Sequence, residues 1–295
     1  MLLLPIHTRL LENGDDLISL LQKSTPVSDG DILIISSKAV ATVEGAAIDL
    51  RQITPSNNAE KWSKACGRSA AFCQAVLDET KRLHGEVVGT CPGALLTELR
   101  PDGLTEGTIF AANAGLDQSN VADGFAIGWP RDPVASVQKL RMAIEKSLLV
   151  GSLARCSSQK KRTTSNQQPA TQNNHCIAVI VSDSCCIPRR RGVTAHALAV
   201  SGIDPLHSEM GNVDLFGKPL RITIEARADQ LATAANILMG NAGQGVPAAI
   251  IRDHGIPLTR FEGWVPGIEP ENDLFRALLR QPRHTSAADR SAEFA

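Results

Sequence analysis

Apolar blocks alternate with polar turns along the first 130 residues, and this pattern predicts short strands and amphipathic helices. The block 31–36, Asp-Ile-Leu-Ile-Ile-Ser, follows an Asp29-Gly30 turn and is typical of a buried strand. Asp16 places a carboxylate before a helix expected over 17–23, and Ser56 can cap a helix expected to end at Arg68. The other elements expected in this half are a helix over 70–83 and strands near Val87, Leu95 and Ile109.

The second half begins with an amphipathic helix that Pro133 introduces, because apolar residues recur at helical spacing from Val137 to Leu148. Further apolar patterns predict strands over 176–181, 194–200, 220–226 and 246–251 and a helix over 228–239. Helices and strands alternate irregularly, so we expect an α+β (mixed α/β) fold. We expect one domain over 1–283, with a flexible polar insertion at about 156–174 and a disordered tail over 284–295.

Composition excludes several classes of partner. The 295 residues carry a net charge of −1, which argues against binding to nucleic acid or to an acidic membrane surface. No apolar run approaches the roughly 20 residues of a membrane span. The seven cysteines contain no Cys-x-x-Cys pair, so we expect reduced thiols in a cytoplasmic protein. Aromatic residues make up only 3% of the chain, and the core is therefore expected to be aliphatic.

Two aspartates have surroundings typical of metal ligands. Asp117 lies in Asn113-Ala-Gly-Leu-Asp-Gln-Ser-Asn120, and Asp183 lies in Val181-Ser-Asp-Ser184. Each ends or closely follows an apolar run, and a carboxylate beside Ser, Asn or Gly suits a hard divalent cation with oxygen ligands. Two such motifs suggest an ion that is bound to a nucleotide phosphate. Aspartate after a strand is also common turn chemistry, which is the alternative for each motif taken alone.

Phosphate contacts are expected at three further places. The loop from Gly240 to Gly245 is glycine-rich, so its backbone N–H groups can approach an anion closely, although a helix C-cap followed by a turn has the same composition. Arg190 lies in an Arg189-Arg190-Arg191 run whose guanidinium groups suit phosphate, with a solvated surface as the alternative. Lys38, just after the 31–36 strand, is another candidate.

Taken in order, these segments resemble the coenzyme F420-0:γ-glutamyl ligase family, and the resemblance spans about residues 4–253 without the polar insertion. The matching stretches are Leu4–Arg9, Gly14–Leu17, Gly30–Leu33, Val43–Gly45, Asn113–Val121, Val181–Ser184, Asp214–Leu220, Ala228–Ala232 and Met239–Pro247. Resemblance to this family implies a two-subdomain fold and an intertwined homodimer with the active site near the subunit interface.

The resemblance also implies an activity. Members of the family use GTP and Mg or Mn, with a monovalent cation as a further candidate, to join L-glutamate to a deazaflavin precursor through an acyl phosphate. The implied metal ligands are Asp117 and Asp183, which are also the candidate catalytic residues, with Ser184 and Asn241 at a second metal position. The implied GTP contacts are Leu4, Pro5, Ile6, His7, Ser37, Lys38, Asn120, Gly240, Gly243, Gly245 and Val246.

Three departures from the family pattern keep alternatives open. Cys186-Ile187 stands where the family has Gly-Arg, Ala41-Thr42 stands where it has Ser-Lys, and Asn241 replaces a Glu or Gln. Two cations near the nucleotide are thereby lost. The three hypotheses are a ligase acting on the F420 precursor, a ligase acting on another acceptor such as a folate, and a non-catalytic nucleotide-binding relative.

Overall fold

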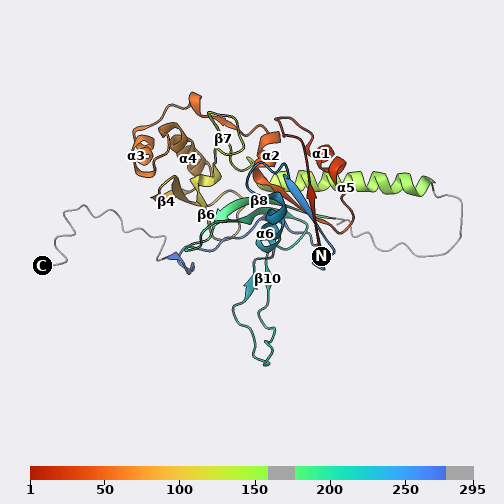
Figure 1. Ribbon diagram of the computed structural model, residues 1–295. Helices are drawn as coiled ribbons and strands as arrows, with labels where there is room; N and C mark the ends of the chain where they lie inside the picture. Colours follow the sequence, from red (N-terminus) through yellow and green to blue (C-terminus); the bar gives the residue numbers. More distant parts are fainter. Residues whose placement is uncertain (159–176, 277–295) are drawn as a thin grey trace. The chain divides into compact units, whose positions relative to one another are not determined.

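The computed structural model describes residues 1–158 and 177–276, and these form two compact units (Figure 1). Unit 1 contains residues 1–47 and 127–265, and unit 2 contains residues 48–126 together with the segment that follows residue 265. The mixture of helices with several separate sheets confirms the expected α+β class. Most of the expected insertion and all of the expected 284–295 tail lie outside the described residues.

A six-stranded sheet forms the centre of unit 1, in the order β1-β12-β2-β8-β9-β13. Its strands are β1 (Leu2–Ile6), β12 (Ala248–Arg252), β2 (Ile32–Ser36), β8 (Ala178–Cys186), β9 (Val193–Ser201) and β13 (Glu262–Trp264). Only β2 and β8 run parallel within this sheet, and the other neighbours are antiparallel. The aliphatic run in β2 is fully buried, as expected of a central strand with both faces covered.

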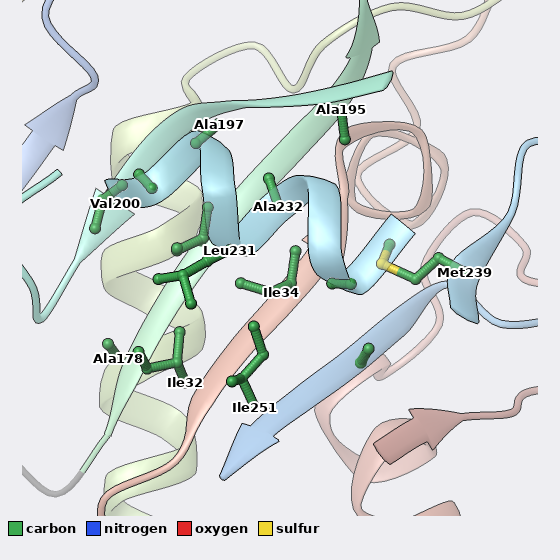
Figure 2. Packing of buried hydrophobic residues seen from close by; sticks show 14 of the residues in the cluster. Ile32, Ile34, Ala178, Ala195, Ala197, Val200, Leu231, Ala232, Met239 and Ile251 are labelled. Atoms are coloured by element: carbon green, nitrogen blue, oxygen red, sulfur yellow. The ribbon is translucent and has the colours of Figure 1, made fainter. Parts of the chain in front are cut away.

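Two helices cover the two faces of this sheet. Helix α6 (Arg227–Met239) packs Leu231, Ala232 and Ala235 against alternate strand residues such as Ile34 and Ile180, which form one aliphatic cluster (Figure 2). The small side chains on this face of α6 let the helix approach the strands closely. Helix α5 (Pro133–Ser158) lies against the opposite face, as its expected inward residues Val137, Leu140 and Ile144 are buried.

Two elements of unit 1 differ from the expectations. Strand β8 continues to Cys186, so Asp183 lies inside a strand rather than at its end. The strand expected over 220–226 is reduced to β11 (Ile224–Glu225), which pairs with β10 (His207–Ser208). Between them, residues 209–223 form a hairpin, called the arm here, which projects from the sheet (Figure 1). Of the apolar residues that predicted a strand there, Ile222 is exposed on the arm and Ile224 is exposed in β11.

Two short helices complete unit 1 near its amino terminus. Helix α1 (Leu17–Ser24) begins where the Asp16 carboxylate accepts a hydrogen bond from the Ser19 N–H, as expected for a capping residue. Helix α2 (Ser37–Val43) starts directly after β2 and was not expected from the sequence. No helix among the described residues is both long enough and apolar enough to cross a membrane.

Unit 2 combines a helix pair with a small sheet. Its elements are β3 (Ile48–Asp49), η1 (Leu50–Gln52), α3 (Asn57–Cys66), α4 (Ala70–Arg82), β4 (Glu86–Cys91), β5 (Ala94–Leu99), β6 (Ile109–Ala112), η2 (Asn113–Gly115) and β7 (Phe125–Ala126). Ser56 and Ser69 cap the two helices as acceptors of backbone N–H groups. Helix α3 stops at Cys66 rather than Arg68, because Gly67 adopts the left-handed conformation that ends helices.

Candidate functional site

One edge of the unit 1 sheet collects four of the segments that the sequence singled out. Ile6, Ala248 and Ile35 occupy facing positions across β1, β12 and β2, and Ser36 of β2 pairs with Ser182 of β8. The Leu4–His7 segment, the start of α2, the glycine-rich loop and the Asp183-Ser184 pair therefore all lie near this edge. The carboxyl ends of parallel strands such as β2 and β8 are a common place for ligand sites.

Backbone hydrogen bonds fix the glycine-rich loop between its neighbours. The Thr8 N–H donates to the Gly245 carbonyl at 3.1 Å, and the Ser36 N–H donates to the Pro247 carbonyl at 2.9 Å. Gly240 and Gly245 have positive φ angles of 68° and 67°, a conformation that residues with a Cβ rarely adopt. Glycine at these two positions is therefore explained by the backbone path, whether or not the loop binds phosphate.

Two of the expected metal residues touch each other. The Ser184 hydroxyl donates to the Asn241 Oδ1 at 3.3 Å, so the β8 strand and the loop after α6 meet at this point. Both side chains are neutral oxygen donors, and Asp183 precedes Ser184 in β8. An oxygen-only donor set of this kind fits Mg²⁺ or Mn²⁺ better than a soft, thiolate-binding metal.

Asp183 is held by a residue that the sequence reasoning missed. The buried Trp129 donates its Nε1–H to the Asp183 Oδ2 at 2.7 Å. Trp129 lies between β7 and α5, 54 positions before Asp183, so no local spacing connects them. The signal available from the sequence was that a buried indole N–H almost always has an acceptor, and the chain has only three tryptophans.

The start of α2 carries an unusual buried hydroxyl. Ser37 is fully buried, and within the described ranges its Oγ has no hydrogen-bond partner. A buried hydroxyl without a partner costs free energy, so such a group in a native fold calls for an explanation, such as a ligand or an ordered water. Ser37 and the neighbouring Lys38 follow β2 directly, at the same sheet edge as the glycine-rich loop.

The Asp117 segment belongs to unit 2, where its backbone is strained. Asn113 and Ala114 have positive φ angles of 54° and 51°, and Asn120 has one of 55°. Non-glycine residues in this region concentrate at functional sites. The Asp117 carboxylate accepts hydrogen bonds from the Gln118 N–H at 2.7 Å and from the Ser119 hydroxyl. Because Asp117 and Asp183 belong to different units, a shared cation between them stays a prediction.

Arg190 lies farther along the β8–β9 hairpin. Cys186 pairs with Val193, and Arg190 follows in the turn between the two strands. Cys186 is four positions beyond Ser182, so the turn begins about 13 Å farther along the strand at ordinary strand rise. The role of Arg190 as a phosphate contact also stays a prediction.

Asp229, Cys185 and His196 form a group of largely buried ionisable side chains at β8 and its neighbours. Burial raises the pKa of Asp229, which accepts a hydrogen bond from the Ala197 N–H at 2.8 Å. Burial also raises the pKa of the Cys185 thiol to about 11, so this thiol is protonated and a poor nucleophile at neutral pH. Both ring nitrogens of His196 are buried and lack partners among the described residues. Across those residues, no group of three His, Cys, Asp or Glu side chains could hold a metal ion.

The raised pKa of Asp229 predicts a pH effect on stability. Between the ordinary pKa of 3.8 and the raised value, the folded state binds more protons than the unfolded state, so stability falls as pH rises through this window. Asp229→Asn cannot ionise and removes this dependence. We expect the stability of the variant relative to the parent chain to increase as pH rises above the ordinary pKa of 3.8, measured by urea unfolding. A difference in stability that is constant with pH would contradict this.

Comparison with known proteins gives a consistent result. A model of the F420-0:Gamma-glutamyl ligase family matches residues 5–151 and 166–253, leaving out a stretch that overlaps the expected insertion. The chain is 34% identical over 251 residues to the coenzyme F420:L-glutamate ligase of Methanocaldococcus jannaschii, covering 85% of this chain and 86% of that protein. It is 33% identical over 274 residues to the enzyme of the same name from Methanopyrus kandleri, covering 93% and 92%.

Proposed function

Because the chain belongs to the F420-0:γ-glutamyl ligase family, we propose that it joins L-glutamate to a coenzyme F420 precursor in a GTP- and divalent-metal-dependent reaction. One structural observation supports the proposal in addition to family membership. The segments expected to bind the nucleotide and the metal meet at one edge of the unit 1 sheet. That edge presents oxygen donors, a glycine-rich loop and the start of α2 together.

The proposed chemistry has two steps. A carboxylate oxygen of the acceptor attacks the γ-phosphorus of GTP, so an O–P bond forms, the bond to the β-phosphate oxygen breaks, and GDP leaves. The glutamate amine then attacks the acyl carbon, the acyl C–O bond breaks, and inorganic phosphate leaves as the amine loses a proton. Phosphoryl transfer of this kind needs positioning and charge neutralisation rather than a nucleophilic side chain.

The chain's own residues have distinct roles in this proposal. Asp183, Ser184 and Asn241 would hold a Mg²⁺ or Mn²⁺ ion in unit 1, and Asp117 is a candidate metal ligand within unit 2. When bound, such an ion neutralises charge on the phosphate oxygens. The glycine-rich loop and the Leu4–His7 segment would orient the GTP phosphates with backbone groups, and the buried Ser37 hydroxyl would gain a partner.

The activity test uses the full-length chain with GTP, Mg²⁺ or Mn²⁺, L-glutamate and the deazaflavin precursor. We expect an amide product whose mass is greater by one glutamate residue, with one GDP and one phosphate released for each amide formed. Omission of glutamate and omission of the metal are the two controls. Absence of both product and GDP under all conditions would contradict the proposal.

The departures from the family pattern favour a second candidate, a ligase with another carboxylate acceptor. Cys186 ends β8, Ile187 follows it at the base of the hairpin turn, and Thr42 lies in α2, so cations expected at these positions are lost. A panel of acceptors that includes a folate, read by mass spectrometry, separates the candidates. Product from the F420 precursor alone would exclude the second candidate. Tight GTP binding without turnover on any acceptor would instead indicate a non-catalytic relative.

We further propose that the protein is a homodimer and that the arm contributes to its interface. Leu215 and Phe216 are 101% and 88% exposed, and Ile222 is 88% exposed. Backbone hydrogen bonds such as the Leu220 N–H to the Asn212 carbonyl at 2.7 Å order the arm as a hairpin. Apolar side chains that are exposed together on an ordered segment are typical of protein–protein interfaces.

Replacing Leu215 and Phe216 by Ser is expected to weaken the dimer at least about tenfold, because buried aromatic and aliphatic anchors dominate interface free energies. Size-exclusion chromatography with light scattering over a concentration series measures the change. Lys218→Ser, on the same arm, is the matched control and is expected to leave the dimer intact. A parent chain that is monomeric at all concentrations would rule the proposal out.

A further inference from the structure

The contact between Trp129 and Asp183 has features beyond ordinary core packing. Trp129 is only 3% exposed, and its indole ring packs at 59° against Trp264, with 6.2 Å between the ring centroids. Its Nε1–H reaches the Asp183 Oδ2 at 2.7 Å, at the short end of the range for hydrogen bonds to a carboxylate. A buried, packed donor of this kind has little rotational freedom, so it imposes an orientation on the carboxylate that it contacts.

The hydrogen bond distinguishes the two oxygens of Asp183. An indole N–H is a donor only, and an ionised carboxylate is an acceptor only. The bond occupies Oδ2, and Oδ1 takes no part in it. The carboxylate is therefore fixed through one oxygen, Oδ2.

We propose that Trp129 is a positioning residue for metal binding, which holds the Asp183 carboxylate so that Oδ1 is presented to the divalent cation. The inference rests on the proposed function, since it requires a cation at Asp183. Groups that hydrogen-bond to metal-ligating carboxylates commonly change metal affinity by about ten- to a hundredfold when they are removed. Trp129 matches this description through the contact of a rigid, buried indole with one ligand oxygen.

The test replaces the indole with a ring that cannot donate. Trp129→Phe removes the N–H and keeps an aromatic ring against Trp264. We expect it to weaken Mn²⁺ binding by about ten- to a hundredfold, measured on the full-length protein by electron paramagnetic resonance of free Mn²⁺. Ligase activity should fall at limiting Mn²⁺ and recover at saturating Mn²⁺, which a general loss of structure would not produce.

Trp264→Phe is the matched control, because it makes the same change in the same aromatic pair and leaves the hydrogen bond from the Trp129 Nε1–H to the Asp183 Oδ2 in place. Its Mn²⁺ affinity should stay within about twofold of the parent value. If Trp129→Phe does not fold, β-(3-benzothienyl)alanine at position 129 replaces the N–H with sulfur and keeps the bicyclic shape. That substitution is expected to give the same loss of affinity.

Two outcomes separate the inference from the function on which it rests. In the first outcome, the parent chain binds Mn²⁺, the Asp183→Asn variant does not bind it, and the Trp129→Phe variant binds it with full affinity. The positioning role is then wrong, and the metal site at Asp183 stands. If Asp183→Asn binds Mn²⁺ as tightly as the parent chain, the cation does not lie at Asp183. That second result overturns both the positioning role and the proposed metal site.

Discussion

Asp183→Asn is expected to lower the rate of glutamate ligation by about a thousandfold, the largest change predicted for any single substitution in this chain. A metal ligand contributes several kcal/mol of charge stabilisation in phosphoryl transfer, and about 4 kcal/mol corresponds to a factor of 10³ in rate. The Asn side chain is nearly isosteric and keeps an oxygen that can accept from Trp129, so folding should be preserved. Steady-state release of GDP at saturating Mn²⁺ measures the loss.

The matched control for this change is Asp29→Asn. Asp29 is an exposed carboxylate in the turn before β2, at the opposite end of that strand from the candidate site. The Asp29→Asn variant should keep the parent rate and the parent Mn²⁺ affinity, because the Asp29 carboxylate is solvated and lies far along the strand from the candidate site. An Asp183→Asn variant that retains more than about a tenth of the parent rate would exclude Asp183 as a metal ligand in catalysis.

Arg252→Ala is expected to lower the free energy of unfolding by about 3 kcal/mol, because it leaves a buried carboxylate without its cation. The Asp31 side chain is 1% exposed, and it receives hydrogen bonds from the Arg252 Nε at 2.8 Å and Nη2 at 2.7 Å. These two residues tie the start of β2 to the end of β12. A loss of this size is a large part of the 5–15 kcal/mol that typically stabilises a domain.

Urea unfolding of the full-length chain, followed by tryptophan fluorescence, measures this loss of stability. The double variant Asp31→Asn with Arg252→Ala should recover part of the loss, since it removes both charges and leaves none buried and unpaired. Arg9→Ala breaks the exposed ion pair with Asp15 and should not shift the midpoint resolvably. Equal losses in the single and double variants would show that packing, rather than the unpaired charge, causes the destabilisation.

The sequence predicted the elements whose pattern is local and failed where pairing is distant. Strand β2 and helices α4 and α6 follow the expected ranges closely, since β2 is an apolar run that follows a turn and the two helices have a helical period. Strand β1 was not expected, because Pro5 interrupts its apolar run. As an edge strand it tolerates the missing N–H. Which strands lie side by side could not be read from the sequence, as β2 pairs with two strands far away in the chain.

The candidate site shows the same limit. Ser184 and Asn241 were both chosen from the sequence, and the structure joins them through a direct hydrogen bond. Trp129 was missed, because its relation to Asp183 depends on how α5 and β8 pack and not on spacing. The length of β8 was also underestimated. Its end, Asp183–Cys186, alternates half-buried and exposed positions, whereas the expected strand was identified from an unbroken apolar run.

The position of β12 between β1 and β2 has a consequence for synthesis of the protein. Both outer strands of this trio are complete by residue 36, yet the strand that joins them is not made until residue 252. A nascent chain on the ribosome therefore carries two apolar segments with unpaired edges through most of translation. Products that terminate before residue 248 never receive the joining strand, and we expect such fragments to aggregate or to be retained by chaperones.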